Sequence, residues 1–182
     1  MMNKYSLALL TALSCSILVT GCSDVISAGA EAPLREDHGN RTIGSYVDDE
    51  VIETLALVNL NKGSEEMKAT NISVTSFNGQ VLLTGQAPSD ASRLEAEQIV
   101  SQIRKVKKIH NEINISGISS AIARTNDAWI TTKVKAQLLT HENIDGSRIK
   151  VVTDSSTVYL MGLVSQQEAD LAIHIVHGIP GI

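Results

Sequence analysis

One pattern of helices and strands occurs twice in this 182-residue chain, and the repeat limits the fold more than any other feature of the sequence. Each copy joins an amphipathic helical run to two short alternating stretches and then to a second helical run. In the first copy, Asn78-Gly79 marks a hairpin turn between the alternating stretches. The elements expected there are a helix over 48–61, strands over 72–74 and 81–87, a helix over 91–104 and a strand over 106–115.

The second copy has the same order of elements. Its expected elements are a helix over 126–141, strands over 149–151 and 158–164 that flank a turn at 154–157, and a helix over 166–178. Aligning Ala172 with Ala96 pairs Ile182 with Val106, so residues 107–115 have no counterpart. A sheet that is short of its last strand has an unpaired edge. Either the sequence is truncated, or this domain is less stable than the first, or an outside strand completes its sheet.

The N-terminus has the features of a secretory signal, with a weakly basic start and an apolar run over 5–19. It ends in Leu18-Val-Thr-Gly-Cys22, which resembles a bacterial lipobox. The resemblance implies cleavage after Gly21, diacylglycerol on Cys22 and acylation of the new N-terminus, for example by palmitate. The residue after the cysteine is Ser23. An aspartate at this position would indicate retention in the inner membrane, so the resemblance points to the outer membrane. The alternative is an ordinary secretory signal in which Cys22 is incidental.

Composition and the repeat together divide the chain into five expected segments. The stretch after Cys22 is rich in Ala, Gly and Ser and lacks periodicity, which predicts a flexible tether. A short Gly- and Ser-containing stretch separates the two copies. The expected segments are a lipoprotein signal peptide over 1–21, a tether over 22–46, a first domain over 47–116, a linker over 117–125 and a second domain, incomplete at its C-terminus, over 126–182.

The helix expected over 126–141 has one apolar stripe for the core of its own domain. Asn126 or Asp127 is the expected N-cap. At about 100° per residue, Ile130, Val134 and Leu138 lie on one side of the helix.

A second face of this helix lies away from the core stripe. Trp129 and Leu139 fall within about 80° of each other on that far side. Lys133 and Lys135 lie on either side of it. An aromatic ring and a leucine between lysines suggest a docking surface for lipid or for a partner. The alternative is that Trp129 covers a neighbouring loop or packs on another domain.

The repeated pattern resembles the BON (bacterial OsmY and nodulation) domain, and the resemblance covers residue 46 to the C-terminus. It is closest over 126–134, 137–140 and 158–164, the last of which carries the V-x-L-x-G-x-V motif. Two copies behind a lipobox resemble the dual-BON outer-membrane lipoproteins associated with division and envelope stress. The implied fold class is α+β, with two tandem small BON domains. In each, a short mixed or antiparallel sheet packs against two helices, and the second copy lacks its last strand.

In that family the second domain binds anionic phospholipid, chiefly through its first helix. The resemblance therefore implies that Trp129, Lys133, Lys135 and Leu139 bind lipid here. The first copy lacks this set, because the matching positions of Trp129, Lys133 and Leu139 hold Val51, Leu55 and Asn61. We expect the first domain to serve packing or protein contact instead.

The returning strands of the two copies differ in their outward faces. In the first copy this face reads Gln80, Leu82, Thr84 and Gln86. In the second it reads Thr157, Tyr159, Met161 and Leu163, which is more apolar. This face either belongs to a binding surface or packs on the first domain, because it should not be left in water.

The residues predict no catalytic or metal centre. His174 and His177 have the spacing of a helical metal pair, but no Cys or carboxylate set completes it. A net charge of −5 and an aromatic content of 3% argue against nucleic-acid binding. The acidic run 48–50 is expected to be solvated charge near a helix N-terminus. We therefore expect no enzyme activity, no cofactor and no bound metal.

The leading functional hypothesis is a periplasm-facing outer-membrane lipoprotein that binds anionic phospholipid membranes and supports envelope integrity. One alternative is a haemolysin-like virulence factor that damages host membranes. Another is a non-enzymatic adaptor that recruits envelope proteins.

Overall fold

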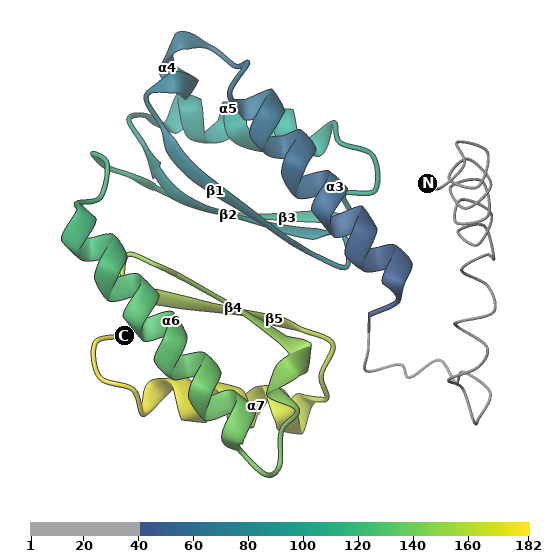
Figure 1. Cartoon of the computed structure of the whole chain (residues 1–182). Coiled ribbons are helices and arrows are strands. Elements are labelled where there is room, and N and C mark those ends of the chain that lie inside the picture. The colour runs from purple at the N-terminus through teal and green to yellow at the C-terminus, as the bar shows by residue number, and fades with distance from the viewer. Residues whose placement is uncertain (1–40) are drawn as a thin grey trace, which may run out of the picture. The chain divides into compact units, whose positions relative to one another are not determined.

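In each copy of the repeat, helices lie on one face of a small sheet (Figure 1). The computed structural model describes residues 41–182, which belong to one compact unit. The first domain contains α3 (Ile43–Leu60), α4 (Glu65–Lys68), β1 (Asn71–Phe77), β2 (Gln80–Ala87), α5 (Asp90–Ser101) and β3 (Lys108–Ile115). The second contains α6 (Ala121–Thr140), the 3₁₀ turn η1 (Gly146–Arg148), β4 (Ile149–Asp154), β5 (Thr157–Gly162) and α7 (Gln166–His177). The predicted α+β class is confirmed.

The two sheets differ by one strand. In the first, the strand order is β1-β2-β3, with β1 antiparallel and β3 parallel to β2, so the sheet is mixed. In the second, β4 and β5 pair antiparallel from Ile149–Gly162 to Asp154–Thr157. Within residues 41–182 no third strand joins this second sheet.

Each domain has its own hydrophobic core under its first helix. The core stripes predicted from sequence are confirmed: Ile52, Ala56 and Leu60 are buried in one core, and Ile130, Val134 and Leu138 are buried in the other. Both stripes repeat every four residues, so one side of each helix packs on its sheet and the other side faces outward.

The two sheets face each other, with the helices on the outer sides (Figure 1). Leu82, Thr84 and Gln86, on the face of β2 that looks away from its own core, are buried. The Gln86 amide donates to Asp154 at 3.3 Å, and the Lys150 ammonium donates to Glu53 at 2.8 Å. Both contacts join the two domains. Of the two interpretations of the β5 outer face, the structure supports the one in which this face packs toward the first domain.

Both first helices begin earlier than their sequence patterns predict. α3 starts at Ile43, where the Thr42 hydroxyl accepts from the Ser45 N–H at 3.1 Å, so residues 43–46 are helix rather than tether. α6 starts at Ala121 with Ser120 as N-cap, so Asn126 and Asp127 do not cap it, and residues 121–125 of the expected linker are helical. Ser120 satisfies a free N–H of the first turn, and the residues that follow lack a helix breaker.

Two matching aspartates, Asp49 and Asp127, are buried. For Asp49 this corrects the prediction that the acidic run 48–50 is solvated charge, whereas Glu50 is exposed. Asp49 on α3 accepts from the backbone N–H of Asn78 at 2.7 Å and of Gly79 at 2.9 Å. Asp127 on α6 accepts from Ser155 and Ser156 at 3.0 and 2.8 Å in the same way. In each domain this carboxylate ties the first helix to the hairpin turn and so fixes the rotation of the helix about its axis.

The ionised form of Asp49 is the one that the fold stabilises. Burial is the largest single influence and raises its pKa. The hydrogen bonds from Ser76, Gly79, Asn78 and Arg41 together outweigh burial and lower the pKa below its ordinary value. Because the folded-state pKa is the lower one, this stabilisation is present above the unfolded pKa and is lost as the pH falls through the folded value.

We predict that Asp49→Ala lowers the free energy of unfolding by about 2–3 kcal/mol, because buried donors at Ser76, Asn78 and Gly79 lose their acceptor. Chemical denaturation monitored by circular dichroism measures this change. In the wild type the free energy of unfolding should fall as the pH drops below about 4, and part of that dependence should vanish in the variant. A variant with wild-type stability and an unchanged pH profile would contradict this account.

Candidate functional site

The outer side of α6 carries exposed apolar side chains opposite a fully buried stripe. Trp129 is 48% exposed and Leu139 is 62% exposed. Their sequence neighbours Ile130 and Leu138 are 0% and 1% exposed and pack in the core. The two exposed side chains therefore lie on a surface that the domain does not use for its own packing.

Lysines accompany the indole on this surface. Lys133 and Lys135 are exposed, and the Lys133 ammonium lies 4.1 Å from the centroid of the Trp129 ring. A cation over an indole face is attracted to the ring quadrupole, with a free energy of about 0.5–1 kcal/mol at an exposed site. Neither lysine forms an ion pair within residues 41–182. Their charges remain available to an external anion.

Ile122 belongs to the same surface, and the sequence prediction missed it. This side chain is 83% exposed and lies two helical turns before Trp129, so the two share one face. With Ala121 and Thr125 they line a shallow groove. The prediction missed Ile122 because it placed the start of the helix at Asn126. The signal that could have found it is Ser120, a good N-cap immediately before Ala121 and Ile122. We call Ile122, Trp129, Lys133, Lys135 and Leu139 the α6 outer face.

The equivalent surface of the first domain is apolar but carries no lysine. Val51 and Leu55, the counterparts of Trp129 and Lys133, are exposed on α3. They line a groove with Tyr46, Val47 and Glu50. Asn61, the counterpart of Leu139, is the C-cap of α3. The two helices therefore share a scaffold and an exposed apolar side, but only α6 adds an indole and lysines.

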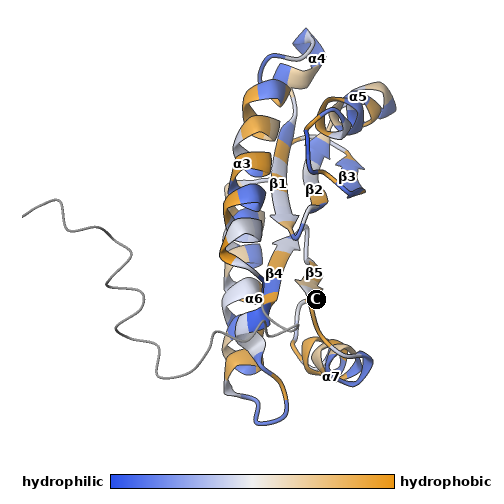
Figure 2. Ribbon diagram, turned by 90° about the vertical axis from the view of Figure 1, so that its right-hand side faces the viewer, coloured by the Kyte–Doolittle hydropathy of each residue, from blue (hydrophilic) through white to orange (hydrophobic). Residues whose placement is uncertain are grey.

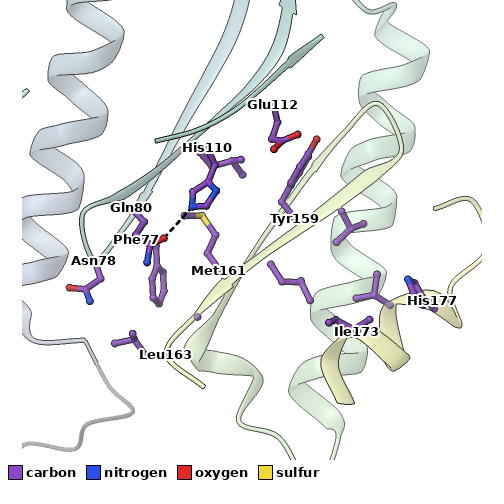
Figure 3. Close-up of a pocket in the computed structure, with 15 residues that line it drawn as sticks. Phe77, Asn78, Gln80, His110, Glu112, Tyr159, Met161, Leu163, Ile173 and His177 are labelled. Carbon is purple, nitrogen blue, oxygen red and sulfur yellow. Dashed lines mark hydrogen bonds between the residues drawn. The ribbon is translucent and has the colours of Figure 1, made fainter. Parts of the chain in front are cut away.

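A cleft lies between the two sheets, beside β5 (Figure 3). Glu112 from the first domain and Tyr159 from the second lie next to each other there (Figure 3). Burial raises the pKa of Tyr159, and the negative charges of Glu112 and Asp154 raise it further. Tyr159 thus stays a neutral phenol at neutral pH.

His174 and His177 lie in the last turn of α7. In the part of the chain that the structure describes, no group of three or more His, Cys, Asp or Glu residues could hold a metal ion. No helix of this part is long and apolar enough to cross a membrane. The expected signal peptide over 1–21 and the lipidation site Cys22 lie outside the described residues.

Comparison with known proteins gives a consistent set of relatives. The family model described as BON domain matches residues 48–117 and 126–182. A protein named 21 kDa hemolysin, from Actinobacillus pleuropneumoniae, is 33% identical over 80% of this chain and 79% of its own length. The Outer membrane lipoprotein DolP of Haemophilus influenzae is 28% identical over 93% and 88%. The Osmotically-inducible protein Y of Escherichia coli is 25% identical over 98% and 92%.

Proposed function

The chain belongs to the BON-domain family, and from this premise we propose that it is an outer-membrane lipoprotein whose α6 outer face binds anionic phospholipid. It faces the periplasm and supports the integrity of the envelope by binding rather than by catalysis. The observation that carries the proposal is Trp129, a half-exposed indole with Lys133 over its ring.

The chemistry of the α6 outer face matches the boundary of a bilayer. An indole prefers the headgroup region, where its ring contacts acyl chains and its N–H stays hydrated. Ile122 and Leu139 add apolar area that is already exposed, so their burial in lipid costs no core packing. Lys133 and Lys135 each contribute about 1 kcal/mol near an anionic surface.

The expected location rests on the N-terminus and on a relative. The lipobox ending at Cys22 would supply an acyl anchor, and one relative is named an outer membrane lipoprotein. Several acyl chains hold a protein at a membrane durably. The α6 outer face would then determine how the anchored domains meet the lipid headgroups.

We predict that Trp129→Glu removes most of the binding to anionic vesicles. A carboxylate at this position replaces the indole and repels the lipid phosphates. The measurement is flotation of the unacylated Cys22→Ser protein with phosphatidylglycerol-containing vesicles. Binding should fall at least tenfold, and Ile122→Asn should weaken it less.

Val51→Glu is the matched control, because Val51 holds the equivalent position on α3 and is 50% exposed. It introduces the same charge on the other copy of the repeat, and binding should stay near that of the wild type. Equal flotation of wild type and Trp129→Glu, or equal losses in Trp129→Glu and Val51→Glu, would rule out the α6 outer face as the specific lipid contact.

A second candidate function comes from the relative named 21 kDa hemolysin. For the present chain we predict that purified protein releases no haemoglobin from erythrocytes at concentrations that saturate anionic vesicles. The reason is that a helix lying at the interface contacts one leaflet only. Lysis by protein free of host cytolysins, and its loss in Trp129→Glu, would instead favour a membrane-damaging function.

A further inference from the structure

The outer side of α3 carries an apolar surface that is left uncovered within residues 41–182. The core stripe on the opposite side of the helix is at most 6% exposed. The outer apolar side chains are 43–85% exposed, and they are Ile43, Tyr46, Val47, Val51, Leu55 and Val58. Several apolar side chains gathered on one helix face mark a contact surface, whereas a single exposed leucine does not.

Four residues of this side have the spacing of a coiled-coil seam. Val47, Val51, Thr54 and Val58 follow one another at intervals of four, three and four residues. At about 100° per residue they lie within about 60° of one another on the helix. All four are small and β-branched, so a second helix can approach closely along this line. We call these four residues the α3 seam.

Charge is distributed unevenly along α3. All of its acidic residues lie in its first half, and the helix contains no lysine or arginine. Glu50 is exposed in that first half, and Lys62 is exposed just after the helix ends. Neither forms an ion pair within residues 41–182. One helix therefore presents an acidic end and a basic end beside the same apolar line.

This charge pattern is complementary to itself when the helix is reversed. Two α3 helices in the same direction would place their acidic halves at the same level, which costs free energy through like-charge repulsion. In opposite directions, Lys62 of each copy lies toward the acidic half of the other. The antiparallel arrangement also brings opposite ends of the helix dipoles together.

The size of the surface suits a dimer of moderate affinity. The six outer side chains expose on the order of 600 Å² per copy, so that a pair would bury about 1,200 Å², the lower limit of specific interfaces. An antiparallel pair of identical surfaces is a two-fold contact, which closes at two copies.

A bilayer matches this surface less well than a second copy does. Glu50 lines the groove with Val47 and Val51, and a carboxylate there would meet lipid phosphates of the same charge. The α6 outer face has lysines in this role, whereas the α3 seam has none. A second copy of the chain provides both the apolar line and the cation.

We propose that α3 is a dimerisation helix, in which two copies of this chain pair their α3 seams in antiparallel directions. The two-fold axis crosses the helices near Thr54, so that Thr54 lies close to its equivalent in the other copy. Val47 lies far from its own equivalent, and Lys62 lies toward the acidic half of the other helix. The inference does not depend on lipid binding, because the α3 seam and the α6 outer face share no residue.

Sedimentation velocity of the unacylated Cys22→Ser protein over a wide range of concentration tests the pairing. We expect the sedimentation coefficient to rise from that of one copy to that of two and no further. Val51→Glu should weaken dimerisation at least tenfold, and Val58→Ser is the milder variant should Val51→Glu fail to fold. Trp129→Glu is the matched control on α6 and should leave dimerisation unchanged.

Vesicle flotation at protein concentrations below that of dimerisation compares single copies. Trp129→Glu should thus lose lipid binding and keep the dimer, whereas Val51→Glu should lose the dimer and keep lipid binding. Lys62→Glu should weaken dimerisation several-fold, and adding Glu50→Lys to it should restore most of the loss.

Chemical cross-linking tests the direction of the two helices. In a protein without Cys15 and Cys22, Thr54→Cys should cross-link to its equivalent with a short bismaleimide. Val47→Cys should not, because antiparallel helices separate the two copies of this residue by at least about 15 Å at 1.5 Å per residue.

The proposal is overturned if the wild type stays monomeric at the highest concentration, or if Val51→Glu and Val58→Ser both associate as the wild type does. It is equally overturned if Val47→Cys cross-links as readily as Thr54→Cys, or if Trp129→Glu alone abolishes the dimer.

Discussion

The outward direction of Trp129 depends on the packing of the opposite side of α6. Ile130, Val134 and Leu138 are at most 1% exposed, and burying each such side chain stabilises the fold by about 1.5–3 kcal/mol. Asp127 adds two hydrogen bonds to the β4–β5 turn. A rotation of the helix that buried the indole would break all of these contacts. The core packing of the domain therefore fixes the indole in an exposed position. A membrane can contact the indole without any loss of core packing.

The repeat provides one scaffold with two different outer surfaces. In both domains a buried aspartate ties the first helix to the hairpin turn, and both helices leave apolar side chains exposed. Hydrophobic and hydrophilic residues are interspersed along α3 (Figure 2). Only α6 combines exposed apolar side chains with an indole and lysines. The sheets also differ within residues 41–182, because there β2 has a strand neighbour on both edges and β5 on one. The proposed lipid contact thus lies at a place where the outer surfaces of the two copies diverge.

Sequence periodicity predicted the four long helices, the strands in their order along the chain and the core stripes, because these depend on the spacing of apolar residues. It misjudged helix starts, since caps such as Thr42 and Ser120 depend on a single side chain. It placed Asp49 in solvent, because its partners at Ser76, Asn78 and Gly79 are distant in sequence. It also did not determine that Thr84 and Gln86 are buried, because the partners of Gln86, among them Asp154 of the second domain, are distant in sequence. Local patterns carry no information on such long-range contacts.

Trp129 is the only tryptophan of the chain, so its fluorescence reports the proposed lipid contact directly. The decisive measurement is the emission of the unacylated protein on addition of anionic vesicles, with brominated acyl chains as quenchers. The account predicts a blue shift and strong quenching by bromolipid, since the ring enters the acyl boundary. Emission that stays unshifted and unquenched while the protein co-floats with the vesicles would contradict it.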